Sequence, residues 1–189
     1  MINQSDFLSN FKISREQYRK TGLKWKDLSH IYEDHVSNSN LLEAAGNYIA
    51  DMLRKTPGVH SVKQRIKDPE HLIEKIIRKK IDNAERQITI ENYKTEITDL
   101  IGIRALHLFK SDWLGIHDFI INTWNLREKP TANLRDGDPQ EVISVFEDKG
   151  CDIKRHPFGY RSVHYLVKTC PTIVEHISEV QVRTIFEEA

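Results

Sequence analysis

The segment from residue 99 to residue 109 constrains the fold of this chain more than any other. It reads Asp-Leu-Ile-Gly-Ile-Arg-Ala-Leu-His-Leu-Phe, with apolar residues at odd and at even positions. Successive side chains of a strand point to opposite faces of its sheet, so a segment that is apolar on both faces predicts a central strand. Arg104 lies within it, and a charge among apolar residues is unfavourable unless it is paired or used. A structural ion pair and a functional site explain this arginine about equally well.

Helical spacing dominates the chain before about residue 56. Two apolar stripes predict two helices, separated by Asn38-Ser39-Asn40 and closed by Pro57-Gly58. Alternation over residues 62–67 predicts a short strand. Asp68-Pro69 then supplies a cap and a proline at the first helical position, which predicts a helix to about residue 84. We expect this helix to bury one apolar stripe, consisting of Leu72, Ile73, Ile76, Ile77 and Ile81.

The second half of the chain mixes helix and strand. We expect a helix at 111–124, a strand and a polar connection within 127–147, and a turn-rich loop at 149–159. Two strands follow, at 161–169 and 172–183, and the last residues begin a helix. The pattern predicts an α+β fold, with helices first and then a mixed sheet on which helices pack.

Composition excludes several classes of function. The 189 residues suit one domain or one domain with a small appendage, and 39% hydrophobic with 30% charged residues is typical of a soluble globular chain. The 28 basic residues equal the 28 acidic ones, which argues against a general nucleic-acid coat or an anionic-membrane binder. No apolar run approaches membrane-spanning length, and no signal peptide is visible. Cys151 and Cys170 form no Cys-x-x-Cys pair, which is typical of a reduced, cytoplasmic protein.

Two carboxylates stand where they could share a metal ion. Asp99 opens the central strand, and Glu179 lies on the polar face of the last strand. Carboxylates on neighbouring strands can hold Mg²⁺, which prefers oxygen ligands and keeps waters and substrate phosphates in its shell. This arrangement is common in phosphoryl transfer. A solvated sheet edge is the simpler explanation of the polar face taken alone.

Cations and a glycine-containing loop could complete a nucleotide site. Lys63, Arg65 and Lys67 share one face of their strand, and Lys75 follows one helix away, although basic surface stripes are usually just solvated. In the segment 155–164, a glycine lets the chain turn, a tyrosine could stack on a base, and Arg161 and His164 could contact phosphate. An ordinary turn with a core tyrosine would explain that segment by itself. No Gly-rich phosphate-binding motif occurs.

Four segments in this order resemble the RelA/SpoT synthetases. They are Arg65-Ile-Lys67 with Lys75 beyond it, Asp99 to Arg104, Gly159 to His164, and Glu179 to Thr184. The resemblance implies a nucleotidyltransferase-like mixed five-stranded sheet flanked by helices. It divides the chain into an N-terminal helical segment, 1–58, and a synthetase domain, 59–189. The family continues with a Trp-containing helix, so we expect the domain to be cut short after Ala189.

The resemblance also implies a reaction and its residues. A GTP pyrophosphokinase moves a pyrophosphate group from ATP to the 3′-hydroxyl of GDP or GTP, giving (p)ppGpp and AMP. Asp99 and Glu179 would hold Mg²⁺, and Glu179 would help to take the proton of the hydroxyl. The residues that would hold the adenine and the phosphates of ATP are Arg65, Arg104, Lys67 and Lys75. Those that would hold the acceptor nucleotide are Tyr160 on the guanine, with Arg161, His156, Gln181 and His164, the last of which would contact phosphate or assist transfer.

Departures from the family pattern leave the acceptor open. Where the family often has Lys-x-Asn before Gly-Tyr, this chain has His156-Pro-Phe158, which weakens one phosphate contact and removes a polar side chain. The acceptor could therefore be the 3′ end of tRNA, as in toxin-like relatives, although zero net charge mildly disfavours it. A catalytically silent nucleotide-sensing module is the third reading, which the presence of Asp99 and Glu179 disfavours. A homo-oligomer is left open.

Overall fold

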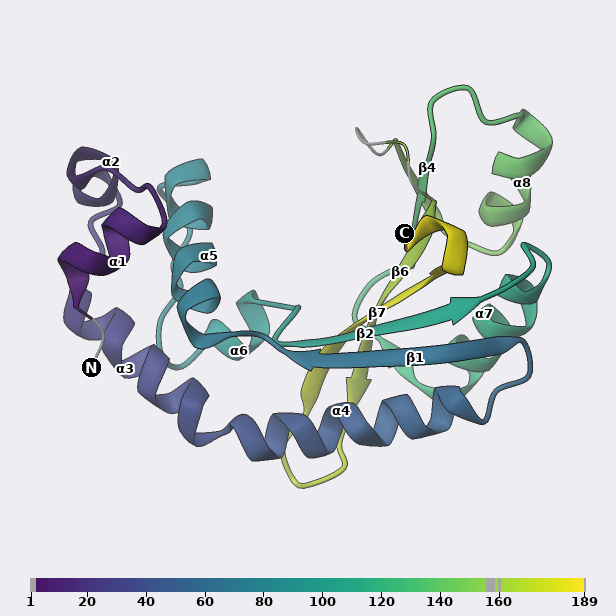
Figure 1. Ribbon diagram of the computed structural model, residues 1–189, viewed down its shortest axis with the longest axis horizontal. Coiled ribbons are helices and arrows are strands. Elements are labelled where there is room, and N and C mark those ends of the chain that lie inside the picture. Colours follow the sequence, from purple (N-terminus) through teal and green to yellow (C-terminus); the bar gives the residue numbers. More distant parts are fainter. Residues whose placement is uncertain (1–2, 156–158, 160, 189) are drawn as a thin grey trace.

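The computed structural model describes residues 3–155, 159 and 161–188. Its helices are α1 (Gln4–Asn10), α2 (Arg15–Lys20), α3 (Trp25–Ser37), α4 (Ser39–Arg54), α5 (Pro69–Asp82), α6 (Tyr93–Glu96), α7 (Asp112–Thr123), α8 (Gln140–Asp148) and the short 3₁₀ helix η1 (Ile185–Glu187). Its strands are β1 (Val59–Ile66), β2 (Ile101–His107), β3 (Asn125–Leu126), β4 (Thr131–Leu134), β5 (Asp152–Arg155), β6 (Ser162–Thr169) and β7 (His176–Thr184). Figure 1 shows the sheet beside a cluster of helices at the end where β1 finishes and β2 begins.

One mixed sheet runs through the molecule in the order β1-β2-β7-β6-β4-β5, and β3 pairs with β6. β2 is parallel to β7 and β4 to β5, whereas the other pairs are antiparallel. The predicted α+β fold, with a mixed sheet flanked by helices, is confirmed. The described part of the sheet has seven strands rather than the five expected. β3 and β5 make the difference, because strands of two and four residues are too short to leave a periodic signal.

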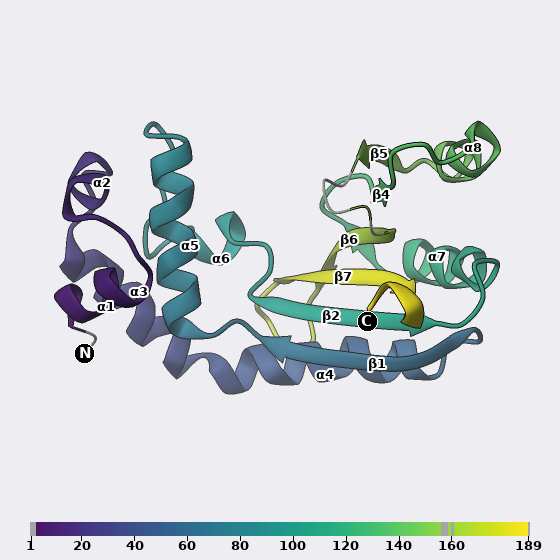
Figure 2. The same cartoon turned by 45° about the horizontal axis from the view of Figure 1, so that its top comes forward.

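Helices α4 and α7 cover one face of the sheet. Their apolar residues pack with inward-facing residues of β2, β6 and β7 in a single buried cluster. Figure 2 shows α4 running along the sheet beneath β1. Gly46 allows this close approach, because a Cβ there would lie 2.4 Å from Nε2 of Gln64 and 3.1 Å from a methyl group of Ile101. The opposite face of the sheet is left to polar side chains.

A second buried cluster joins α1, α2 and α3 to α5 and to the segment that follows it. Asp68 caps α5 as predicted, since its carboxylate accepts hydrogen bonds from the backbone N–H groups of Glu70 and His71. The expected burial of Ile81 is wrong: 42% of this residue is exposed, because it lies in the last turn of the helix, beyond the buried stripe. The division expected at residue 58 stays a prediction. None of the described helices has the length and apolar character needed to cross a membrane.

Several elements depart from the expected secondary structure. α1 and α2 precede the two helices expected before residue 56. Residues 127–147, expected as a strand and a polar connection, hold β4 and most of α8. The helix follows Gly137, Asp138 and Pro139, a turn signal whose meaning as a helix start was missed. The loop expected at 149–159 includes β5, which is a strand because it pairs in parallel with β4.

A buried polar network lies inside the larger core. The indole N–H of Trp113 donates a hydrogen bond to the hydroxyl of Tyr165, 3.0 Å away, and that hydroxyl lies 3.0 Å from Nδ1 of His117. His117 has no ion-pair partner among the described residues, and a buried imidazole without one is neutral. Burial lowers the pKa of His117. Burial lowers the pKa of three further histidines in the same way, namely His35, His107 and His176.

The lowered pKa values of these histidines predict that the folded protein loses stability in mild acid. In the unfolded chain a histidine takes up a proton near its ordinary pKa of about 6.5, which a folded buried histidine resists. Stability is therefore complete above that pH and falls as the pH drops below it, by up to about 1.4 kcal/mol per pH unit for each histidine. We expect His117→Asn to flatten the dependence of the unfolding free energy on pH between 7 and 5. Urea denaturation at several pH values would measure it.

The matched control is His60→Asn, since His60 lies exposed on β1. It should leave the dependence on pH as it is in the wild type. Equal slopes for both variants would contradict a neutral, buried His117.

Candidate active site

The polar face of the sheet gathers side chains from β1, β2, β7 and β6. Residues directly opposite each other on neighbouring strands point to the same face. Arg65 pairs with Gly102, which pairs in turn with Glu179. By the same register, the next row across the sheet consists of Lys63, Arg104, Gln181 and His164. The alternation along each strand therefore brings together residues that lie more than a hundred positions apart.

A cavity of about 230 Å³ opens on this face. It is lined by Lys63, Gln64, Arg65, Asp99, Gly102, Ile103, Arg104, Glu179 and Gln181. Gly102 has no side chain to fill the space between its neighbours, and the side chain of Arg65 lies over it. Both predicted metal ligands and both predicted adenine contacts thus line one cavity.

Asp99 is the most constrained side chain of the cavity. It lies just before β2 with 15% of its side chain exposed, and its Oδ2 is 2.9 Å from Nζ of Lys67 and 2.7 Å from Nζ of Lys75. Burial by itself raises the pKa of Asp99, but the hydrogen bonds and charges of Lys75 and Lys67 outweigh it and lower that pKa. Asp99 is therefore an anion held by two ammonium groups.

Glu179 lies in the middle of β7, within electrostatic reach of Asp99. Burial raises its pKa, as the charge of Asp99 does, but the hydrogen bond and charge of His164 and the charge of Lys75 outweigh them and lower it. Nδ1 of His164 is 3.2 Å from Oε1 of Glu179, and its Nε2 is 2.9 Å from the hydroxyl of Ser162. An ionised carboxylate only accepts, so Nδ1 carries a proton and the imidazole is fixed between Glu179 and Ser162.

The two carboxylates fit a cation that prefers oxygen and keeps most of its water. Oδ1 of Asp99 is buried and has no hydrogen-bond partner among the residues that the structure describes. A buried acceptor without a donor is unfavourable, and a cation would satisfy it. No group of three or more His, Cys, Asp or Glu residues is arranged to hold a metal within the described ranges. A site with two protein carboxylates leaves its other positions to water and phosphate, as Mg²⁺ requires.

Glu188 is a site residue that the sequence reasoning missed. It follows η1, and its Oε1 lies 3.1 Å from Nζ of Lys63 and 3.1 Å from Nη1 of Arg104. Its other oxygen pairs with Arg183. No local pattern could have predicted these contacts, because up to 125 positions separate the partners. Arg104 is consequently both an ion-paired residue and a cavity residue, whereas Arg65 forms no ion pair with any described residue.

Arg161 lies apart from this cavity, whereas Lys67, Lys75 and His164 contact the carboxylates that line it. Its guanidinium forms a two-point ion pair with the buried carboxylate of Asp138, and its backbone N–H donates to Glu187. The hydrogen bond to Asp138 raises the pKa of Arg161. Its predicted contact with an acceptor would have to compete with this pair. His156 and Tyr160 lie outside the described residues.

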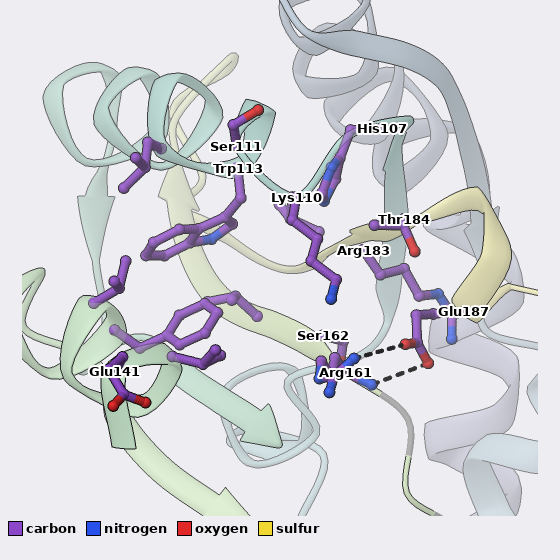
Figure 3. Close-up of a pocket in the computed structure, with 16 residues that line it drawn as sticks. His107, Lys110, Ser111, Trp113, Glu141, Arg161, Ser162, Arg183, Thr184 and Glu187 are labelled. Carbon is purple, nitrogen blue, oxygen red and sulfur yellow. Dashed lines mark hydrogen bonds and ion pairs between the residues drawn. The ribbon is translucent and has the colours of Figure 1, made fainter. Parts of the chain in front are cut away.

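A second cavity, of about 330 Å³, lies at the carboxyl ends of β2 and β7. Figure 3 shows Trp113 on its wall and Arg161 joined to Glu187 at its edge. The cavity is larger than the first. Lys110, Arg161 and Arg183 line it, but Arg161 is paired with Asp138, and apolar residues of α7 and α8 form much of its wall. Of the two cavities, the smaller combines its arginines with the unpartnered buried oxygen of Asp99, so it is the better candidate active site.

Comparisons with known proteins bear on the same region of the chain. A family model described as the region found in RelA / SpoT proteins matches residues 64–189. A GTP pyrophosphokinase family protein from Streptococcus pneumoniae is 22% identical, with a TM-score of 0.46 over 88% of this chain and 72% of that chain. Small alarmone synthetase 1 from Bacillus subtilis, solved with its product pppGpp, is 18% identical, with a TM-score of 0.46 over 87% and 75%. Small alarmone synthetase 2 from that organism is 18% identical, with a TM-score of 0.48 over 82% and 73%. No curated protein matches this chain.

The lysine pair predicts how Asp99 titrates. With Lys67→Met and Lys75→Met combined, burial is left without its opposing charges, so the pKa of Asp99 should rise to or above the ordinary value of about 3.9. Carboxyl-carbon NMR over a pH series would measure the change. Lys63→Met is the matched control, because Lys63 pairs with Glu188 instead. An unchanged titration in the double variant would show that the pairs do not form in solution.

Proposed function

The chain belongs to the RelA/SpoT family, and on that premise we propose that it transfers the pyrophosphate group of ATP to the 3′-hydroxyl of GDP or GTP, giving (p)ppGpp and AMP. The observation that carries the proposal is the cavity on the polar face of the sheet. Two ionised carboxylates, Asp99 and Glu179, line it together with two arginines, and two lysines bind Asp99 at its edge. Positioning and charge neutralisation by such groups supply most of the catalysis in phosphoryl transfer.

In this proposal planar guanidinium groups bind the adenine of the donor, ATP, and ammonium groups bind its phosphates. We assign the adenine to Arg65 and Arg104, whose guanidinium planes suit stacking. Lys67 and Lys75 supply point charges for the phosphates. Asp99 and Glu179 would hold Mg²⁺, which when bound neutralises phosphate oxygens as charge develops on them.

Transfer needs a group that takes the proton of the acceptor. The 3′-oxygen attacks the β-phosphorus of ATP, the bond from that phosphorus to the α,β-bridging oxygen breaks, and AMP leaves with the electron pair. We propose that Glu179 takes the proton of the 3′-hydroxyl. Because the pKa of Glu179 is lowered, it is a weak base, and its contribution rests on holding the hydroxyl within hydrogen-bond reach. His164, bonded to Glu179, orients that carboxylate.

The acceptor site is assigned by family resemblance. It comprises Tyr160 for the guanine, with His156, Arg161, Gln181 and His164 for the rest of the nucleotide. Gln181 lines the cavity, and His164 binds Glu179. Transfer to the 3′ end of tRNA remains the alternative acceptor chemistry, and a silent nucleotide-sensing module the alternative without chemistry.

One assay separates these alternatives. Incubation of the protein with Mg²⁺ and γ-labelled ATP, together with GDP, GTP or tRNA, should label GDP or GTP while AMP appears in equal amount. Chromatography of the products would measure both. Label in tRNA alone would establish the alternative acceptor. Absence of AMP with every acceptor would overturn the proposed synthesis.

Asp99→Asn should lower the rate of transfer at least about a thousandfold. The substitution removes a metal ligand and leaves Lys67 and Lys75 without their carboxylate. Initial rates of AMP release would measure the loss. Asp51→Asn is the matched control, since Asp51 is exposed on α4 and pairs only with Arg54 among the described residues. It should keep the rate of the wild type. Substantial transfer by Asp99→Asn would refute the role of this carboxylate.

A further inference from the structure

His35 contacts the backbone of a candidate site residue, Lys67, from a helix outside the matched family region. It lies in the last turns of α3 and is 1% exposed. Its Nε2 is 2.7 Å from the backbone carbonyl oxygen of Lys67, 32 positions along the chain. A carbonyl oxygen only accepts, so Nε2 carries the proton and donates it. Nδ1 is buried without a hydrogen-bond partner among the described residues, so the contact with Lys67 is the reason for a polar side chain here.

Two hydrogen bonds hold the backbone of Lys67, one at its N–H and one at its carbonyl oxygen. Its N–H donates to the carbonyl oxygen of Leu100, 2.9 Å away, and its own carbonyl oxygen accepts from His35. Leu100 is the neighbour of Asp99, to which the side chain of Lys67 also binds. Asp68, the next residue, caps α5, which carries Lys75. His35 therefore acts on the position of Lys67, whereas the position of Lys75 is set by α5 and its own cap.

The helix that carries His35 is tied to the same region by a second set of contacts. The hydroxyl of Tyr93 donates to Oδ2 of Asp34, 2.6 Å away, and Nζ of Lys94 lies 2.7 Å from the same oxygen. Both partners precede Asp99 by only a few residues. Asp34 and His35 thus fasten α3 to the segment that leads into β2 as well as to the end of β1.

We propose that His35 is a positioning residue of the donor site, which holds the peptide of Lys67 so that its ammonium group faces Asp99 and the phosphates of ATP. The placement of Lys67 rests on the structure alone, whereas the effect on ATP rests on the proposed function. The N-terminal helices then contribute to the placement of Lys67 through the hydrogen bond of His35, besides the contacts of Asp34 and their packing against α5.

A purely structural role is the competing explanation, and the chain offers a matched control for it. His117 is also fully buried, also has a lowered pKa from burial, and also makes one hydrogen bond, but with Tyr165 in the core beneath the opposite face of the sheet. His35→Leu and His117→Leu each remove one buried imidazole. General destabilisation affects both variants, whereas displacement of Lys67 follows only from the first.

Acylation of lysines by a succinimidyl ester, read by mass spectrometry, tests the placement without any catalysis. In the wild type the side chain of Lys67 is only 14% exposed, because it pairs with Asp99. We expect His35→Leu to release this pair and to speed the labelling of Lys67 several-fold over the wild type. Lys75 in the same variant should label at its wild-type rate, and so should Lys67 in His117→Leu. Equal acceleration of Lys67 and Lys75, or of Lys67 in both variants, would overturn the proposal.

Steady-state kinetics tests the consequence for ATP. His35→Leu should raise KM for ATP roughly tenfold, the scale of one lost polar contact, and leave KM for the acceptor nearly unchanged. His35→Gln keeps an N–H donor at a similar reach and should restore KM to within about threefold of the wild type. An equal rise in His117→Leu would count against positioning by His35. A wild-type chain that transfers nothing would refute the proposed function, and the labelling result would still decide the role of His35.

Discussion

An ionised carboxylate that is mostly withdrawn from water must have cations beside it, and the rest of this structure is arranged around that requirement at Asp99. Its two partners come from different elements, Lys67 from the end of β1 and Lys75 from α5. Both elements must therefore meet the start of β2 at fixed positions. The antiparallel pairing of β1 with β2 and the cap at Asp68 provide this, and α3 fastens the junction through His35.

The two faces of the sheet divide the work of folding from that of binding. Apolar side chains of β2, β6 and β7 face α4 and α7 and form the larger core. The alternate side chains carry charge and meet on the open face, where Gly102 leaves room for a ligand. Because the period of a strand is two, the same short segments serve both purposes. The buried face provides the rigid support on which a precise arrangement of charges depends.

Most cations near the cavity have an internal carboxylate partner. Lys67 and Lys75 share Asp99, while Lys63 and Arg104 share Glu188. A polyphosphate that enters the site would exchange these partners for its own oxygens. Such an exchange keeps the charges compensated in both states, which limits the penalty of burying lysine and arginine before a substrate binds.

The sequence by itself determined the longer elements and the side chains that each presents together, and the tertiary structure decided which groups touch. Alternation predicted which side chains of β1 and β7 share a face, and Asp68-Pro69 predicted the start of α5, because hydrogen bonding and side-chain direction within one element are local. The short strands β3 and β5 exist only through pairing with partners, and the contacts of Glu188 and His35 join residues far apart in the chain. Such contacts depend on how separate elements pack, and no spacing within a single element encodes that packing.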